Sequence, residues 1–452
     1  MATEQLRLLD AVDVHLDERP GQPVLVGSLR ASFTSGRTLA GSSFEYATSY
    51  LASPARYEIS PDLPLVAGRQ FSGGDTTLFG AFADVTPDDW GTGLIDAEYQ
   101  QRREPDDPRA IGEFDHLVQQ NDIARMGALR FTTRAAEPPS ERAEQEWLTA
   151  AKHTAANANT VTRIAEAAAR FEEYTATEED IEILGFAGSS LGGARPKATI
   201  RDDDGRLWML KLPSNRDRRS DLEAWEAVAL DIAAQAGLRV PRHRLIRLDE
   251  HKSSLLIERF DRTSDGRHRV GYISAMTAMQ LGPQNQRASY EDFADAIDQL
   301  APVRSRDDLR EMFGRVALTV LVGNVDDHWK NHGFVREETD HGSSWRLSPL
   351  FDVNPTRASS RVRSRRISSS DDATNRDIRS LIDGRDVYQL SARDAAEVLA
   401  DVVSAVEKWR ETAALHQIGH GEIDQMASAF DDMQLDHAAR FVADHEPPTP
   451  TG

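Results

Sequence analysis

The residues best suited to chemistry lie in the tract Val322–Asn331, which reads V-G-N-V-D-D-H-W-K-N. Asp326 is followed five positions later by Asn331, and Asp352 ends the later tract W-R-L-S-P-L-F-D. This set suits metal-assisted phosphoryl transfer, in which one carboxylate orients the attacking hydroxyl and accepts its proton, while an amide and a second carboxylate hold Mg²⁺ beside the phosphates. Because Asp and Asn are also common in loops, the spacing alone fits an ordinary polar loop equally well.

A helix and a strand are expected to position these groups. Apolar residues recur at three- and four-residue intervals through Leu309–Leu321, which predicts a helix buried on most of its surface. Gly323 and Asn324 are a suitable stop for that helix. Trp345–Asp352 is predicted to be a short apolar strand that ends in one carboxylate.

A glycine-rich tract, Leu184–Ala198, reads L-G-F-A-G-S-S-L-G-G-A-R-P-K-A. Its four glycines near two serines allow the backbone to curl closely around an anion. The tract is not a Walker loop, because Ala194 stands six positions after Gly188, where that pattern requires lysine, and it is not G-x-G-x-x-G. A phosphate-binding loop and a flexible connection between two elements both stay open.

A strand lysine and a helix glutamate follow this tract. Lys211 lies within the apolar strand L-W-M-L-K-L, and lysine is rarely buried without a partner. Glu226 lies in the predicted helix Asp221–Ala236, so the two side chains are candidates for the lysine–glutamate pair of kinases. The alternatives are an edge-strand lysine and one of several exposed helix acids.

Composition limits the class of protein. The chain has 452 residues, 39% hydrophobic and 28% charged, which is typical of a soluble globular protein of two or three domains. It has no cysteine, which excludes disulfides and thiolate metal sites, and no apolar run near the ~20 residues of a membrane span. Met1–Asp10 lacks a signal-peptide pattern, so we expect a cytoplasmic protein without membrane contact. A formal net charge of -21 argues against a chain that coats nucleic acid on its own.

The remaining elements are predicted from periodicity. Strands are expected at Ala11–Leu16, Val24–Phe33, Tyr57–Ile59, Gly127–Phe131, Thr199–Ile200, Leu207–Leu212, Arg244–Leu248 and Ser254–Phe260. Helices are expected at Phe44–Leu51, Glu144–Phe171, Asp221–Ala236, Tyr290–Leu300 and Arg393–Thr412. The predicted domains are an α+β subdomain at 1–134, a helical linker at 135–180, a lobe with the glycine tract at 181–262, a helical lobe at 263–440 and a disordered tail at 441–452.

A basic cluster stands out in this acidic chain. The segment Asn354–Asp371 reads N-P-T-R-A-S-S-R-V-R-S-R-R-I-S-S-S-D, and its five arginines are Arg357, Arg361, Arg363, Arg365 and Arg366. The cluster suits contact with phosphate, nucleic acid or an acidic peptide, or phosphorylation of Ser368–Ser370. A mobile solvated loop fits the same composition equally well.

Taken in order, these tracts resemble the HipA family of serine/threonine kinases, the toxin partners of bacterial toxin–antitoxin pairs. The matching tracts are F-D-H-L-V-Q-Q-N-D-I-A-R-M-G-A-L at Phe114–Leu129, S-S-L-G-G-A-R-P-K-A at Ser189–Ala198, L-K-L-P at Leu210–Pro213, G-L-R-V-P at Gly237–Pro241, E-R-F-D-R at Glu258–Arg262, G-N-V-D-D-H-W-K-N and S-P-L-F-D-V-N-P. The resemblance implies an α+β, bilobal protein-kinase-like fold with an extra N-terminal α+β subdomain, which helps bind the antitoxin, and a mainly helical C-lobe.

The resemblance also implies roles for the matching residues of the C-lobe. Asp326 would be the catalytic aspartate, and His328 and Lys330 would line its loop. Asn331 and Asp352 would hold Mg²⁺. F-D-V stands where other kinases have the DFG triplet, which we interpret as a trait of the family.

On the nucleotide side, Lys211 would contact the ATP phosphates with Glu226 as its helix partner, and Glu258 and Phe260 would lie at the hinge under adenine. The other ATP-binding positions implied are Ser190, Leu191, Gly192, Gly193 and Ala194, together with His328 and Asp352. Ser190 matches the serine that such kinases autophosphorylate, which ejects the glycine loop and silences the enzyme; Ser189 is the alternative by one position.

The leading hypothesis is therefore an ATP- and Mg²⁺-dependent protein Ser/Thr kinase that acts as a toxin. Its implied partners are a helix-turn-helix, HipB-like antitoxin, a protein substrate such as an aminoacyl-tRNA synthetase, and DNA only through the antitoxin complex. Two other classes are kept open. One is a catalytically inactive relative that serves as a co-repressor with the antitoxin, and the other is a small-molecule phosphotransferase.

Overall fold

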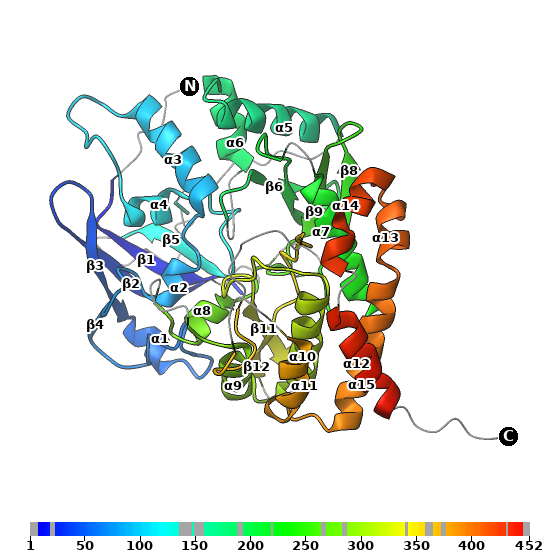
Figure 1. The fold of residues 1–452 in the computed structure, drawn as a ribbon. Coiled ribbons are helices and arrows are strands. Elements are labelled where there is room, and N and C mark those ends of the chain that lie inside the picture. The colour runs from blue at the N-terminus through cyan, green and yellow to red at the C-terminus, as the bar shows by residue number, and fades with distance from the viewer. Residues whose placement is uncertain are drawn as a thin grey trace. The chain divides into compact units, whose positions relative to one another are not determined.

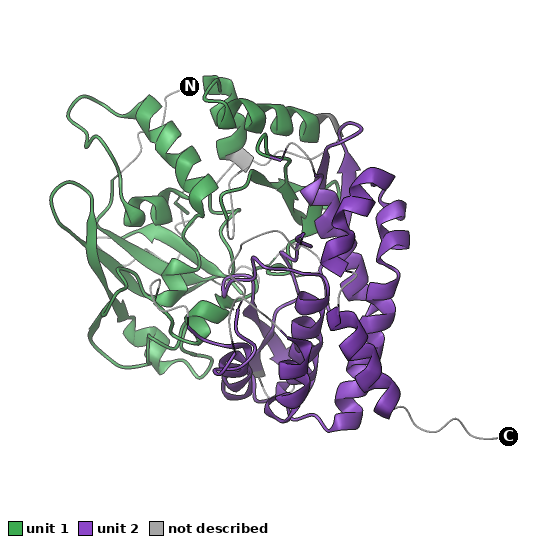
Figure 2. Cartoon of the chain, in the orientation of Figure 1, with its two compact units in different colours: residues 1–216, 256–284, 340–342 green, residues 217–255, 285–339, 343–452 purple. Residues whose placement is uncertain are grey.

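The computed structural model describes residues 8–18, 23–134, 147–148, 158–187, 193–217, 220–263, 268–282, 287–339, 342–357, 365–371, 377–430 and 433–445. The chain divides into two compact units (Figure 2). Unit 1 comprises residues 1–216, 256–284 and 340–342, and unit 2 comprises residues 217–255, 285–339 and 343–452. No helix within the described ranges is long and apolar enough to cross a membrane.

Unit 1 begins with a five-stranded antiparallel sheet of order β4-β3-β2-β1-β5 (Figure 1). Its strands are β1 (Ala11–Leu16), β2 (Val24–Phe33), β3 (Leu39–Tyr46), β4 (Arg69–Phe71) and β5 (Leu129–Thr133). Val14 of β1 lies opposite Gly27 of β2 on one side and Phe131 of β5 on the other. The last strand of this region therefore pairs beside the first.

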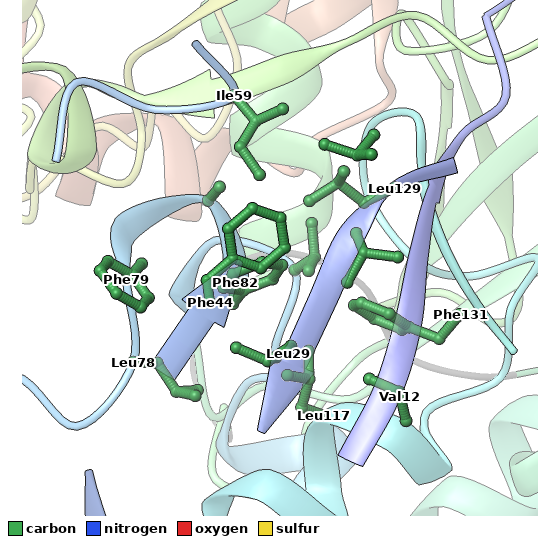
Figure 3. Close-up of a cluster of buried hydrophobic side chains, with 14 of the residues drawn as sticks. Val12, Leu29, Phe44, Ile59, Leu78, Phe79, Phe82, Leu117, Leu129 and Phe131 are labelled. Carbon is green, nitrogen blue, oxygen red and sulfur yellow. The ribbon is translucent and has the colours of Figure 1, made fainter. Parts of the chain in front are cut away.

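The core of this region packs between the sheet and short helices, as Figure 3 shows. The helices are α1 (Thr48–Ala52), α2 (Gly80–Ala83) and α4 (Glu113–Gln119), and the longer helix α3 (Asp89–Arg102) lies between α2 and α4 in the chain. The rings of Phe44 and Phe82 lie 5.4 Å apart, and Phe82 also contacts the ring of Phe131 at 6.4 Å. These three aromatic residues are fully buried, and burying a side chain of this size stabilises the fold by about 1.5–3 kcal/mol.

The rest of unit 1 contains two longer helices, a hairpin and two short elements. Its elements are α5 (Ala158–Glu172), α6 (Glu178–Ala187), β6 (Lys197–Arg201), β7 (Leu207–Lys211), β10 (Tyr272–Ser274) and α8 (Ala275–Ala278). Helix α6 packs against α3, α5 and β6. A four-stranded sheet has the order β6-β7-β9-β8, and the division between the units runs through β9 (Ser253–Glu258), with 256–258 in unit 1.

Unit 2 is mainly helical. Its elements are α7 (Leu222–Gln235), β8 (His243–Arg247), α9 (Tyr290–Leu300), α10 (Ser305–Leu321), β11 (Gly333–Thr339), β12 (Gly342–Leu347), α11 (Ile378–Asp383), the 3-10 helix η1 (Arg385–Tyr388), α12 (Ala392–Glu407), α13 (Trp409–Leu415), α14 (His420–Phe430) and α15 (Met433–His445). Helix α10 is its centre, because α9, α11, η1, α12 and α15 all pack against it.

Most predicted elements are confirmed. Strands β1 and β2 and helix α9 have the predicted bounds, and α7 starts after its predicted first residue, Asp221, whose side chain caps the helix. The β6–β7 hairpin is antiparallel, as expected. Helix α10 covers the predicted Leu309–Leu321 and extends it by one turn toward the N-terminus.

Five predictions are wrong. The strand predicted at Trp345–Asp352 ends at Leu347, two residues before Pro349, which has no amide to donate to a neighbouring strand. Residues 44–46 belong to strand β3, because Phe44 pairs with Leu29 across the sheet, and only 48–52 is helical. Tyr57–Ile59 is no strand, since the Tyr57 backbone bonds the Tyr50 hydroxyl instead. The helix predicted from Glu144 is absent at 147–148, where the backbone of Leu148 bonds Phe131. The helix predicted at 393–412 is interrupted at Lys408, so that α12 and α13 are separate.

The predicted domain boundaries stay predictions. Helix α6 crosses the expected boundary at residue 180, and α15 ends at His445, within the segment predicted to be a tail. Residues 135–146 of the predicted linker and the last residues, 446–452, lie outside the described residues.

Candidate active site

The loop that carries Asp326 starts where helix α10 ends. The backbone at Gly323 has φ +64°, a conformation that favours glycine, and a Cβ there would lie 3.0 Å from the carbonyl oxygen of Thr356. The amide of Asn324 donates to the Thr319 carbonyl at 3.0 Å, which closes the last turn. The predicted helix stop is confirmed, and glycine is required there by both conformation and space.

Helix α10 also holds the strand that leads to Asp352. The Asp308 carboxylate accepts the amide of Leu347 at 2.8 Å, and Arg315 donates to the carbonyl of Ser348 at 2.6 Å. Burial raises the pKa of Asp308, although the Leu347 amide and two nearby arginines oppose the shift. One buried helix therefore fixes both the Asp326 loop at its end and the β12 tract along its side.

A short chain of side chains connects the two tracts. Asn324 accepts a hydrogen bond from the amide of Asn354 at 3.4 Å, and the Asn354 side chain donates to Asp352 at 3.5 Å. Asp352 has φ +57°, a left-handed conformation that is uncommon outside glycine and concentrates at functional sites. The carboxylate predicted at the end of the β12 tract is thus held in a strained backbone.

The two adjacent aspartates of this loop have opposite environments. Asp326 is exposed, whereas Asp327 is buried and accepts hydrogen bonds from the Tyr290 hydroxyl and from His332 Nε2, the latter at 2.9 Å. Tyr290 and His332 are themselves buried. The Asp327 carboxylate is therefore bound within the interior, and the Asp326 carboxylate is the one of the two that is exposed to solvent.

The loop continues with the other predicted residues. His328 is half-buried and Lys330 is exposed, while the amide of Asn331 donates to the His328 carbonyl at 2.8 Å. The Asn331 side chain is buried, and its Nδ2 donates to the carbonyl of Asp326 at 3.2 Å. That bond orients the amide and leaves its oxygen as the atom that can bind a cation.

Asn331 and Asp352 fit Mg²⁺ by ligand type. Both offer oxygen, and Mg²⁺ is usually held by one or two protein oxygens together with phosphates and water rather than by a cage of carboxylates. Within the described residues there is no group of three or more His, Cys, Asp or Glu side chains able to hold a metal. The metal roles stay predictions.

Lys211, which is predicted to contact the ATP phosphates, is the last residue of β7 in unit 1. Lys211 is half-buried and lies opposite Lys197 of β6. Gly193 has φ +111°, so its backbone needs glycine, and Ala194 follows it. Ser189, Ser190, Leu191 and Gly192 lie outside the described residues, and their predicted roles stay predictions.

Lys197 is a charged residue that sequence reasoning missed. It is buried, its Nζ lies 2.5 Å from Asp88 and 3.4 Å from the Gly193 carbonyl, and its own carbonyl accepts the indole N–H of Trp90. Asp88 also caps helix α3 through the amide of Gly91. No local pattern marks this buried pair, because Asp88 lies 109 positions before Lys197 in the chain.

The predicted hinge residues of unit 1 lie beside a buried charge cluster. Glu258 and Phe260 are half-buried, and the next residue, Asp261, is fully buried. Asp261 accepts bonds from Arg259 at 2.6 Å, from Arg262 at 2.6 Å and from the backbone amide of Gly127 at 2.7 Å. Although burial opposes ionisation, these partners hold the pKa of Asp261 well below its usual range.

Arginines of this region also bind the loop before Gly127. Arg259, Arg262 and Arg269 donate to backbone carbonyls of that loop, at Ala124, Ile123 and Asp122 respectively, over 2.6–3.0 Å. The tract N-D-I-A-R-M-G, which supported the family resemblance, is thus held by the tract E-R-F-D-R, which supported it too.

Glu226 lies in the middle of α7 and is buried, so the alternative of an exposed helix acid is wrong. Helix α7 is fixed at its start, because Glu422 of α14 accepts the amide of Asp221 at 2.9 Å and the indole of Trp225 at 2.8 Å. Lys211 belongs to unit 1 and Glu226 to unit 2, and their pairing stays a prediction.

Comparison with known proteins shows which fold this chain is similar to. Over 96% of this chain and 99% of the other, the fold matches a chain of the Shewanella oneidensis MR-1 toxin–antitoxin complex of HipA, HipB and operator DNA, with a TM-score of 0.59 and 16% identity. The predicted α+β fold of HipA type is confirmed.

A second comparison concerns the sequence. Residues 189–410 match the family model described as the HipA-like C-terminal domain, so this chain carries a HipA-like C-terminal domain and its resemblance to the HipA family is confirmed. A putative kinase, Y4dM of Sinorhizobium fredii (strain NBRC 101917 / NGR234), is 26% identical over 163 residues. That match spans 34% of this chain and 38% of the relative. The proinflammatory kinase CtkA of Helicobacter pylori matches 56% of this chain and 94% of its own, with a TM-score of 0.38 and 16% identity.

Proposed function

We propose that this chain is an ATP- and Mg²⁺-dependent Ser/Thr protein kinase of the HipA type. The observation that carries the proposal is the pair of adjacent aspartates, of which Asp327 is buried on Tyr290 and His332 while Asp326 is exposed. A carboxylate held by a fixed neighbour but open to solvent suits a base that must meet a hydroxyl group.

In the proposed reaction, the substrate hydroxyl oxygen forms a bond to the γ-phosphorus, the bond from that phosphorus to the β–γ bridging oxygen breaks, and ADP leaves. Asp326 orients the hydroxyl and accepts its proton. Asn331 and Asp352 are the residues that would hold Mg²⁺, which when bound neutralises phosphate charge. Lys211, with Glu226 as its partner, would contact the phosphates, and the hinge residues Glu258 and Phe260 would contact adenine.

The biological setting we propose is that of a toxin in a type II toxin–antitoxin module. The HipA-like domain and the fold of the Shewanella complex support a helix-turn-helix, HipB-like antitoxin as partner, with DNA contacted through that antitoxin. Autophosphorylation at Ser190, or at Ser189, and an aminoacyl-tRNA synthetase as substrate are the finer parts of the proposal.

The test is incubation of the purified chain with Mg²⁺ and ATP, followed by phosphosite mapping by mass spectrometry, beside an Asp326→Ala control. We expect phosphate on Ser190 or Ser189 in the wild type alone. ATP binding without phosphate on any protein, in the purified sample or in a labelled cell lysate, would favour the inactive co-repressor. A labelled metabolite without a labelled protein would favour the small-molecule phosphotransferase.

A further inference from the structure

The basic cluster contains a contact with the Asp326 loop that the proposed reaction does not use. Nε of Arg365 donates to the backbone carbonyl of Asp327 at 2.9 Å. The guanidinium also lies 5.3 Å from the ring centroid of Trp329, two residues further along the same loop. Arg365 therefore binds the loop at Asp327, the residue next to the candidate catalytic aspartate. The two residues are 38 positions apart in the chain.

The backbone around Arg365 is fixed on helix α9. Arg366 forms an isolated parallel bridge with Ser289, and its carbonyl accepts the amide of Tyr290 at 3.0 Å. The next carbonyl, of Ile367, accepts the amide of Glu291 at 3.2 Å, and the Ile367 side chain is buried. The segment Arg365–Ile367, here called the clip, thus satisfies amides at the start of α9 that the helix itself leaves unpaired.

Tyr290 connects the clip to the loop by a second route. Its amide is held by the clip, and its hydroxyl donates to the buried carboxylate of Asp327. Asp327 is therefore held at two points: its carbonyl by Arg365, and its carboxylate by Tyr290 and His332. Because the peptide unit is planar, fixing the Asp327 carbonyl fixes the following peptide plane, and the carboxylate contacts fix the residue that adjoins Asp326.

The charge of Arg365 suits this role. Burial lowers the pKa of its guanidinium, while the negative charges of Asp327 and Asp326 act in the opposite direction. A guanidinium remains charged at neutral pH even after a shift of a few pKa units. A charged donor forms a stronger hydrogen bond to a carbonyl than a neutral one does.

We propose that Arg365 is a positioning residue for Asp326, and that the clip holds the catalytic loop in its working shape without a phosphate. This inference rests on the proposed kinase function. In kinases controlled by phosphorylation, new pairs between arginine and phosphate order the loop that follows the metal-binding aspartate. Here an arginine after Asp352 binds a backbone carbonyl of the catalytic loop directly, so that order is present in the unmodified chain.

The first test compares steady-state phosphate transfer from ATP by the wild type and by Arg365→Ala, Arg365→Lys and Arg366→Ala. Arg366 is the matched control, because among the described residues its side chain donates one long 3.5 Å bond, to the Ser369 carbonyl, and its substitution removes the same charge from the same segment. We expect Arg365→Ala to lower kcat about 10-fold or more, because small misplacements of a catalytic group are costly. KM for ATP should stay within about twofold, since in the proposal Arg365 acts through its contacts with Asp327 and Trp329. Arg365→Lys should recover part of the loss, and Arg366→Ala should match the wild type.

The second test does not depend on activity. Hydrogen exchange of the peptide that spans Val322–Phe334 should be faster in Arg365→Ala than in the wild type or in Arg366→Ala, because the loop loses its anchor. Wild-type kcat in Arg365→Ala, or unchanged exchange, would overturn the inference. Absence of transfer by the wild type would overturn the proposed function instead, and the exchange result would still decide whether Arg365 holds the loop.

Discussion

Each unit buries one aspartate directly beside a candidate site residue, and the two aspartates are held in different ways. Asp261 of unit 1 follows Phe260 and is surrounded by arginines and the amide of Gly127. Asp327 of unit 2 follows Asp326 and is held by the hydroxyl of Tyr290 and by His332. The negative charge of Asp261 is balanced by positively charged guanidinium groups, whereas the carboxylate of Asp327 is bound by a hydroxyl and an imidazole.

The difference indicates what each site needs. Arg259 and Arg262, which bind Asp261, also donate to the backbone carbonyls of Ala124 and Ile123, so residues 259–262 and the 121–127 loop are held together. The partners of Asp327 fix a single residue, which leaves Asp326 exposed beside it. Loss of the charged cluster around Asp261 should therefore lower mainly the free energy of unfolding. Loss of the contacts around Asp327, which position one loop, should lower mainly kcat.

The largest expected effect on stability comes from the unit 1 aspartate. Asp261→Ala leaves Arg259 and Arg262 buried without their carboxylate, which should lower the free energy of unfolding by about 3–5 kcal/mol. Urea unfolding followed by circular dichroism would measure it. Arg393→Ala is the control, because its exposed pair with Glu397 should contribute less than about 1 kcal/mol. Equal effects of the two variants would mean that the cluster is no scaffold.

Replacing the unit 2 aspartate should change rate more than stability. Asp327→Asn removes the negative charge and replaces one carboxylate oxygen by an NH2 group that cannot accept, so we expect a stability loss of about 1–3 kcal/mol and at least a 10-fold fall in kcat. Tyr290→Phe removes one donor and keeps the carboxylate bound to His332, so its kcat should fall less. If Asp327→Asn unfolds the protein as severely as Asp261→Ala does, the distinction between the two networks fails.

Acid should act on unit 1 through His15. This residue lies on β1 near Thr132, at 3.1 Å, and burial lowers its pKa to about 4 from 6.5, an effect that Arg130 supports and Asp13 and Asp17 oppose. As the pH falls, the unfolded chain therefore binds a proton at His15 before the folded chain does. The contribution of His15 to the free energy of unfolding is full above pH 6.5 and decreases progressively toward about pH 4. Urea unfolding across this pH range should show a decline in the free energy of unfolding. The decline should be smaller in His15→Gln and unchanged in the control His251→Gln, because His251 is exposed. An unchanged decline in His15→Gln would assign the acid sensitivity to other groups.

The smallest expected effect is at the helix stop of unit 2. Gly323→Ala places a Cβ 3.0 Å from the Thr356 carbonyl at a φ of +64°, which should cost about 1–2 kcal/mol. Gly419→Ala is the control, since a Cβ there meets no atom within 4 Å and φ is ordinary. Thermal unfolding of the two variants measures the difference, and equal melting temperatures would contradict the requirement for glycine at 323.

Sequence reasoning succeeded where local pattern and tertiary role coincide. Helix α10 with its glycine stop and the β6–β7 hairpin were predictable, because apolar periodicity and turn residues act over a few positions. It failed for residues 44–46, whose strand depends on pairing with a distant partner, and for the interruption at Lys408, next to Trp409, which is buried against Trp225.

The site itself was predictable only in part. The types and order of Asp326, Asn331 and Asp352 suggested phosphate chemistry, but which of two adjacent aspartates is exposed depends on Tyr290, 37 positions away from Asp327. The contact of Arg365 with Asp327 and the pair of Lys197 with Asp88 also join distant positions. Such pairs leave no periodic signal in the chain, so one sequence cannot reveal them.

The most direct test of the account is phosphate transfer by Asp326→Asn and Asp327→Asn beside the wild type, with ATP affinity and unfolding measured on the same samples. We expect Asp326→Asn to keep the wild-type stability and ATP affinity and to lose at least 100-fold in transfer rate, because an exposed base is removed without disturbing the fold. Transfer by Asp326→Asn at the wild-type rate would contradict the central claim that Asp326 is the catalytic carboxylate of a kinase.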